Sequence, residues 1–123
     1  MKEIYLFFLA DYVIATRMQQ YFEDMLYEYK VDVGLWAHYH SYERTCKVYR
    51  NECREDGMLH LVIGSGGQTL DVDKWYDREW SVFHKDDYGY GRFSVKNSTH
   101  MFFEFVQNRS QKVIDSVWVI RKV

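Results

Sequence analysis

Proline and long apolar runs are missing from this sequence of 123 residues, cysteine is scarce, and positive charge is not in excess. Proline is absent, against a usual share of about 5%, and the sequence offers no physical reason for it. There are only two cysteines. No apolar run approaches the ~20 residues of a membrane-spanning helix, so we expect no membrane segment. The net charge of −2 gives no basic field, so we expect no nucleic-acid partner.

Apolar and aromatic residues are plentiful by contrast. Hydrophobic residues make up 47% of the chain and aromatic residues 19%. A chain of this length is sufficient for one small domain with its own core. The dense aromatic content favours a sheet with one face that packs against something larger.

The spacing of apolar residues predicts one helix followed mainly by strands. The helix shows an apolar stripe at a spacing of 3.6 residues, formed by Met18, Tyr21, Phe22, Met25, Leu26 and Tyr29. A stripe of this kind predicts packing in a core. Residues 31–36 predict a short buried strand. Further strands are predicted over residues 58–63, 91–95, 100–106 and 113–120, the last two paired as a hairpin across a polar turn at 107–111.

His38 and His40 follow the predicted strand 31–36 directly. Because strand side chains alternate between faces, the two imidazoles can project to the same side where the strand ends. Each can then bind a metal ion, or both can share one, at the carboxyl end of a strand. That end is where α/β sheets carry their active sites.

The longer pattern around these histidines resembles a known family. Residues 38–44 read His-Tyr-His-Ser-Tyr-Glu-Arg, and residues 59–67 read Leu-His-Leu-Val-Ile-Gly-Ser-Gly-Gly. A helix-like segment at 21–30, a cysteine-bounded loop at 46–53 and closing strands at 88–93 and 115–120 complete the order. Over residues 17–121 the sequence resembles the C-terminal part of the purple acid phosphatases, in their animal-type branch, within the calcineurin-like metallophosphoesterases.

The resemblance implies a fold and a division of the chain. We expect an α/β fold, the C-terminal part of a metallophosphoesterase α/β sandwich, with one helix followed by mostly antiparallel strands. Residues 17–123 would be the C-terminal portion of the catalytic domain. Residues 1–16 remain an unassigned segment, because the apolar run at 4–10 is marginal as a signal peptide and the resemblance ends there.

The resemblance also implies a binuclear centre of ferric iron and a divalent metal, either zinc, iron or manganese. His38 would be a ligand of the divalent metal and His40 a ligand of the iron. The other metal-binding motifs of the family, such as Gly-Asp-x-x-Tyr and Gly-Asn-His, do not occur in this sequence. Metal sites of useful affinity need at least three protein ligands. We therefore expect an acid phosphatase that acts on phosphate monoesters, with negligible turnover from the isolated chain.

Four further residues are predicted to surround the metal ligands without binding metal. They are Tyr42, Glu43, Arg44 and His60. Glu43 and Arg44 would hold the loop through a local ion pair or backbone contacts. A lone strand histidine such as His60 is more often a packing residue than a ligand. The glycines at 64–67 predict a tight turn with positive φ rather than a phosphate loop.

Cys46 and Cys53 are compatible either with a disulfide-closed loop or with two free thiols, and their spacing does not decide between these. The resemblance favours the disulfide. Two N-x-Ser/Thr sequons place potential glycans at Asn97 and Asn108, both in polar segments between predicted strands. Together these features lead us to expect a secreted or lysosomal parent protein.

A second hypothesis belongs to another functional class. The chain could be a truncated, non-catalytic paralogue that serves as a binding or dimerisation module. It would either fold alone, as a monomer or a homodimer, or pair with a full-length phosphatase through its exposed sheet edge. A third hypothesis is that the chain is a product of gene prediction and is never stably folded. The sequence alone leaves all three hypotheses open.

Overall fold

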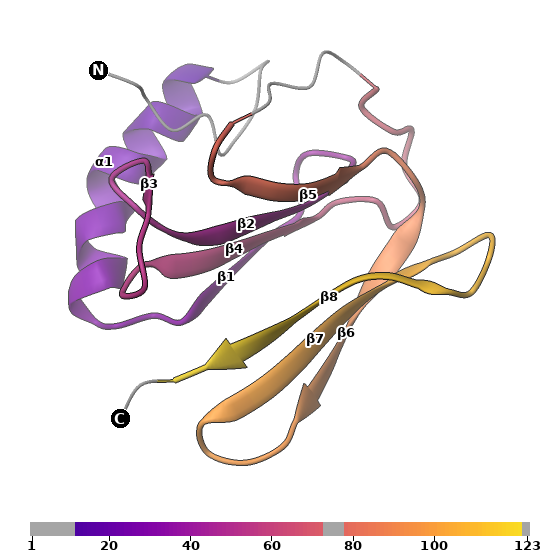
Figure 1. The fold of residues 1–123 in the computed structure, drawn as a ribbon. Coiled ribbons are helices and arrows are strands. Elements are labelled where there is room, and N and C mark those ends of the chain that lie inside the picture. The colour runs from indigo at the N-terminus through magenta and orange to yellow at the C-terminus, as the bar shows by residue number, and fades with distance from the viewer. Residues whose placement is uncertain (1–11, 73–77, 122–123) are drawn as a thin grey trace.

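The computed structural model describes residues 12–72 and 78–121. The chain forms one helix and eight strands in these ranges (Figure 1). In chain order they are α1 (Tyr12–Glu28), β1 (Val33–Trp36), β2 (Tyr42–Tyr49), β3 (Glu52–Cys53), β4 (Met58–Ile63), β5 (Ser81–Lys85), β6 (Gly89–Val95), β7 (His100–Gln107) and β8 (Val113–Ile120). No helix in the described part of the chain is long and apolar enough to cross a membrane.

The strands form two sheets. The larger sheet has the order β1-β4-β2-β3, with β5 paired to β2, and the smaller sheet has the order β6-β7-β8. Only β1 and β4 run parallel, and every other pair is antiparallel. The helix α1 lies beside the larger sheet, away from β6–β8 (Figure 1). The predicted fold is confirmed: a helix is followed by mostly antiparallel strands in an α/β sandwich.

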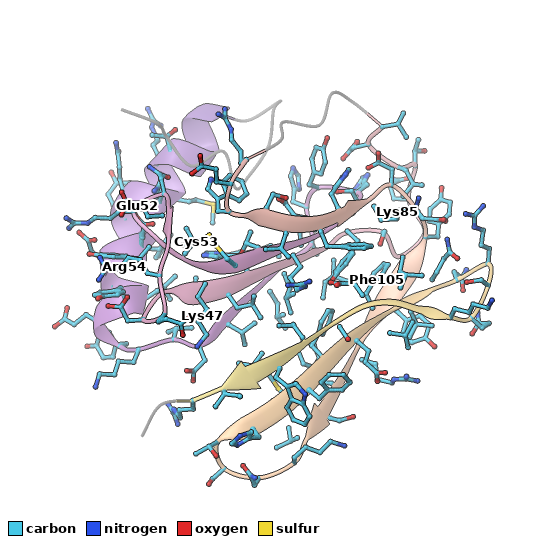
Figure 2. The ribbon with its side chains drawn as sticks, in the orientation of Figure 1. Lys47, Glu52, Cys53, Arg54, Lys85 and Phe105 are labelled. Atoms are coloured by element: carbon cyan, nitrogen blue, oxygen red, sulfur yellow. A yellow bond between two sulfur atoms is a disulfide. The ribbon has the colours of Figure 1, made fainter. Side chains whose placement is uncertain are left out.

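The main core lies between the two sheets. Its buried members are Tyr42, Leu59, Leu61, Phe103, Phe105 and Val119. Alternation along β4 and β7 sends every second apolar side chain into this layer. The Tyr42 and Phe105 rings stack with centroids 3.8 Å apart and an interplanar angle of 7°, and Figure 2 shows Phe105 between the sheets. The core therefore fixes the first residue of β2 firmly against β7.

The hairpin of β2 and β3 holds α1 in place. The Tyr27 and Tyr49 rings stack with centroids 3.7 Å apart, and Tyr49 Oη donates to Asp24 Oδ1 at 2.9 Å. At the tip of the hairpin, Arg50 and Asn51 have φ values of 50° and 70°, as in the two-residue turns that match strand twist. The helix is thus attached along the flank that carries Asp24 and Tyr27.

The predicted core packing of the helical stripe is largely wrong. Tyr21 and Tyr29 are 74% and 76% exposed, and Phe22 and Met25 are also exposed. Leu26 and Met18 remain half-buried. The reason is that one edge of the stripe, with Phe22 and Leu26, borders a cavity beside the sheet instead of packing tightly against it. The other edge, with Tyr21 and Tyr29, faces away from the sheet.

Several element boundaries differ from the predictions. The helix begins at Tyr12, inside the unassigned segment 1–16, and residues 1–11 lie outside the described residues. The sequence analysis predicts no strand at β2, β3 or β5, and β1, β6 and β7 differ from their predicted bounds by one or two residues. The predicted strands at 58–63 and 113–120 coincide with β4 and β8, and the predicted hairpin of the last two strands is confirmed by the pairing of β7 with β8.

Candidate metal-binding loop

The candidate site is the histidine loop, residues 37–41, which joins the carboxyl end of β1 to β2. His38 is exposed, and the His40 side chain retains 32% of its surface. The parallel register of β1 with β4 places Trp36 beside Val62. The segment that leaves β4 at Gly64 therefore runs next to the histidine loop.

The backbone of Gly64 lies directly against the backbone of the histidine loop. Its N–H donates to the carbonyl oxygen of Ser41 at 3.1 Å. A Cβ atom added at Gly64 would overlap the carbonyl oxygen of Tyr39 and lie 2.6 Å from that of Ala37. Glycine is thus required here for close approach of two backbones. The predicted positive φ occurs further along, at Gly67, where φ is 146°.

The segment Thr69–Asp71 also contacts the histidine loop, at His40. The Thr69 carbonyl oxygen lies 2.9 Å from His40 Nδ1, and Asp71 Oδ2 accepts a hydrogen bond of 2.8 Å from the His40 N–H. The Asp71 N–H in turn donates to the His40 carbonyl oxygen at 3.1 Å. Sequence analysis missed Asp71, because a single aspartate in a polar loop carries no recognisable pattern.

A buried polar network secures the start of β2 to β8. Arg44 donates from Nε and Nη2 to the Asp115 carboxylate at 2.7 and 2.9 Å, and Tyr42 Oη donates to the same carboxylate at 2.6 Å. Burial and the hydrogen bond to Asp115 raise the pKa of Tyr42. The hydrogen bond to Asp115 likewise raises the pKa of Arg44. Both side chains are thus held in the proton-bearing form that donates to Asp115.

Glu43 and Arg44 do not form the predicted local ion pair. Neighbouring strand residues point to opposite faces, so Arg44 reaches β8 while Glu43 turns to the face that it shares with His84 of β5. Glu43 is only 6% exposed, and among the described residues its Oε1 has no hydrogen-bond partner. Burial raises the pKa of Glu43 to about 7, against a smaller opposing effect of the hydrogen bond from Ser81.

His60 lies apart from the histidine loop. It pairs with Gly34 in the middle of β1, and its Nδ1 accepts a hydrogen bond of 3.1 Å from Trp36 Nε1. Burial lowers the pKa of His60 to about 4, so the ring is neutral at physiological pH. Together with α1 residues such as Phe22 and Leu26, His60 lines a cavity of about 450 Å³. Its surroundings are those of a packing residue.

The remaining predicted positions lie away from the histidines. Cys46 and Cys53 are joined by a disulfide, which closes the β2–β3 hairpin that carries α1 (Figure 2). Asn97 is exposed in the turn between β6 and β7, and Asn108 is exposed just after β7. Both sequons are therefore accessible in the folded chain.

The histidine loop fits part of a metal centre. Neutral imidazole nitrogens suit zinc and iron, and His40 has its Nδ1 engaged with a carbonyl, as metal-ligating histidines generally do. Within residues 12–72 and 78–121, however, no group of three or more His, Cys, Asp or Glu side chains is arranged to hold a metal ion. Within the described residues, the loop thus offers two possible ligands, which is fewer than a metal site of useful affinity needs.

Comparisons with known proteins agree with this arrangement. Residues 57–116 match the family model described as "Iron/zinc purple acid phosphatase-like protein C". The human protein "Acid phosphatase type 7" is 38% identical over 112 residues, covering 80% of this chain and 26% of that protein. "Probable inactive purple acid phosphatase 27" of Arabidopsis thaliana is 30% identical over 105 residues, covering 77% of this chain and 17% of that protein.

Solved structures show the same relationship. A purple acid phosphatase from yellow lupin seeds superimposes with a TM-score of 0.76 at 28% identity, over 81% of this chain and 19% of that one. GAP50 of Plasmodium shares the fold with a TM-score of 0.72 at 18% identity, over 88% of this chain and 31% of that one. The chain spans about a quarter or less of the length of the curated relatives cited above. It belongs to the purple acid phosphatase family and corresponds to the C-terminal part of that fold.

Proposed function

We propose that this chain forms the C-terminal part of a binuclear-metal acid phosphatase that hydrolyses phosphate monoesters. His38 would bind the divalent metal, either zinc, iron or manganese, and His40 the ferric iron. The observation that carries this proposal is the histidine loop at the carboxyl end of β1, held by Gly64 on one side and by Asp71 on another. When bound, the two metals would bind phosphate and lower the pKa of a coordinated water.

The residues of this chain would have a positioning task in that centre. The loop presents two imidazoles, and the network of Tyr42, Arg44 and Asp115 fixes the strand that follows directly. The remaining ligands must come from outside the residues described. The isolated 123-residue chain should therefore show negligible turnover of p-nitrophenyl phosphate with iron and zinc supplied.

A chimaera tests the proposal directly. The matching C-terminal segment of human acid phosphatase type 7 would be replaced by residues 17–121 of this chain, and hydrolysis of p-nitrophenyl phosphate measured at acid pH. We expect activity that is lost on His38→Ala or His40→Ala and retained on His100→Ala, a histidine in β7. A folded chimaera without activity, or one that is indifferent to both loop substitutions, would contradict the proposal.

The setting that we propose is secreted or lysosomal, with glycans on Asn97 and Asn108. The disulfide between Cys46 and Cys53 supports it, because disulfides persist in oxidising compartments. Expression of the chain behind a secretory leader, followed by glycosidase treatment, tests both sequons. A chain that is secreted without any glycosidase-sensitive mass would contradict the assignment.

The non-catalytic hypothesis also has an observation in its favour. Several apolar residues of α1 are exposed, and among the described strands β1 pairs only with β4, so its other edge is open. A homodimer through these surfaces would give a discrete species of twice the mass in light scattering, with a melting temperature unchanged by chelators. A monomer that is stabilised by zinc or iron would count against this alternative.

A further inference from the structure

We infer that Thr69 and Asp71 are positioning residues that fix the ring of His40 for metal binding before any metal is present. They would hold the imidazole in the tautomer that carries its proton on Nδ1, so that the lone pair lies on Nε2. This inference rests on the proposed role of His40 as a ligand, and it assigns a task to a segment that lies outside the histidine motif.

The tautomer follows from the chemistry of the partner. His40 Nδ1 lies 2.9 Å from the carbonyl oxygen of Thr69. A carbonyl oxygen can only accept a hydrogen bond, so Nδ1 must be the nitrogen that donates. In a neutral imidazole the other nitrogen then carries the lone pair. Nε2 is therefore the nitrogen left to bind a metal, and the His40 side chain still has 32% of its surface exposed.

Asp71 keeps this carbonyl in place. Its Oδ2 accepts from the His40 N–H at 2.8 Å, and its own N–H donates to the His40 carbonyl oxygen at 3.1 Å. Both backbone groups of His40 are thus bonded to one residue, two positions after Thr69. The same carboxylate oxygen lies 3.9 Å from His40 Nδ1.

The small number of ligands on this chain explains why His40 would need residues that orient it. Because the described part of this chain offers only two histidines to the centre, each must be correctly oriented without help from neighbouring ligands on the same chain. Partners that orient a ligating histidine typically change metal affinity by about 10–100-fold when they are removed. In the chimaera described above, which would supply the remaining ligands, we expect a loss in this range for binding of zinc as a probe metal when the Asp71 carboxylate is removed.

The tautomer of His40 can be determined in the absence of metal. Long-range ¹H–¹⁵N NMR spectra of the purified 123-residue chain at pH 8, above the ordinary imidazole pKa of about 6.5, distinguish a protonated Nδ1 from a protonated Nε2. We expect the Nδ1–H form for His40. A wild-type spectrum with the proton on Nε2 overturns the inference without any variant.

Three variants then separate positioning from general stability. Asp71→Ala should give a mixture of His40 tautomers in the 123-residue chain, and in the chimaera it should weaken zinc affinity by about 10–100-fold in calorimetry. Asp71→Asn retains an oxygen acceptor for the His40 N–H and should keep most of the wild-type behaviour. Asp86→Ala removes the carboxylate beside His84 instead, and it should change neither the His40 tautomer nor the zinc affinity.

An Asp71→Ala chain that folds and keeps one His40 tautomer, or an Asp71→Ala chimaera with unchanged zinc affinity, would overturn the role of Asp71. These readings do not involve phosphate hydrolysis. Failure of the positioning inference is therefore distinguishable from failure of the proposed phosphatase function, which the chimaera tests separately.

Discussion

Glu43 should make the chain less stable as the pH rises towards neutrality. Burial raises its pKa from 4.5 to about 7, so the folded chain holds this proton more tightly than the unfolded chain does. Below pH 4.5 the carboxyl is protonated in both states and imposes no penalty. Between 4.5 and about 7 the folded state loses stability progressively, and above about 7 the loss is constant.

The magnitude follows from the size of the shift. The difference between 4.5 and about 7 corresponds to about 3 kcal/mol of unfolding free energy, at roughly 1.4 kcal/mol for each pKa unit. Glu43→Gln replaces the carboxylate with a neutral group of similar shape. We therefore expect the variant to be more stable than the wild type by up to about 3 kcal/mol at pH 8 and nearly equal to it at pH 4.

Urea unfolding followed by tryptophan fluorescence, repeated from pH 4 to pH 8, gives this difference directly. Glu52→Gln is the matched control, because Glu52 lies exposed in β3. It should leave the unfolding free energy nearly unchanged at every pH. An effect of Glu43→Gln that is independent of pH, or a loss of stability at pH 8, would refute the reasoning from burial.

Two other substitutions test the supports of the histidine loop. Asp115→Ala leaves the half-buried guanidinium of Arg44 without its bidentate partner and should lower the unfolding free energy by about 3–5 kcal/mol; an unchanged urea midpoint would contradict this. Gly64→Ala forces the loop backbone to move, so in the chimaera it should weaken binding of zinc as a probe metal. Gly66→Ala is its control, since an added Cβ there meets nothing within 4 Å, and equal zinc affinities for the two alanine variants would argue against the close approach.

The regular spacing of apolar residues made much of the fold predictable. The bounds of strands β4 and β8 agree with the prediction, because both are rich in apolar and β-branched residues and are bounded by polar or turn residues. Strand β2 was missed for a physical reason. Its first residues, Tyr42, Glu43 and Arg44, are buried or half-buried on both faces of the sheet while two of them are charged. Such a segment shows neither alternation nor an apolar run, so no local signal reveals it.

The candidate site was predictable only in its local part. His38 and His40 stand at the end of β1, as their sequence neighbourhood predicted. The residues that hold them are distant in the chain: Asp71 lies 31 positions from His40, and Asp115 lies 71 positions from Arg44. Contacts at such separations depend on how the strands are arranged in the sheets. Where the residues concerned carry no recognisable motif, a single sequence does not reveal that arrangement. The family resemblance pointed to His38 and His40 as the proposed ligands but not to these supports.

The charged residues directly after the histidine loop, Glu43 and Arg44, cost free energy to bury. This cost gives information about their role. Glu43 is enclosed with a raised pKa, and Arg44 and Asp115 form an ion pair with side chains only 15% and 7% exposed. Replacement of such buried charges by apolar residues of similar volume is often neutral or stabilising, so stability alone gives little reason to keep them. Apolar side chains could fill the same space, but they could not fix β2 to β8 with directed hydrogen bonds. That directional rigidity is what two ligands need if they must meet a metal centre completed from elsewhere.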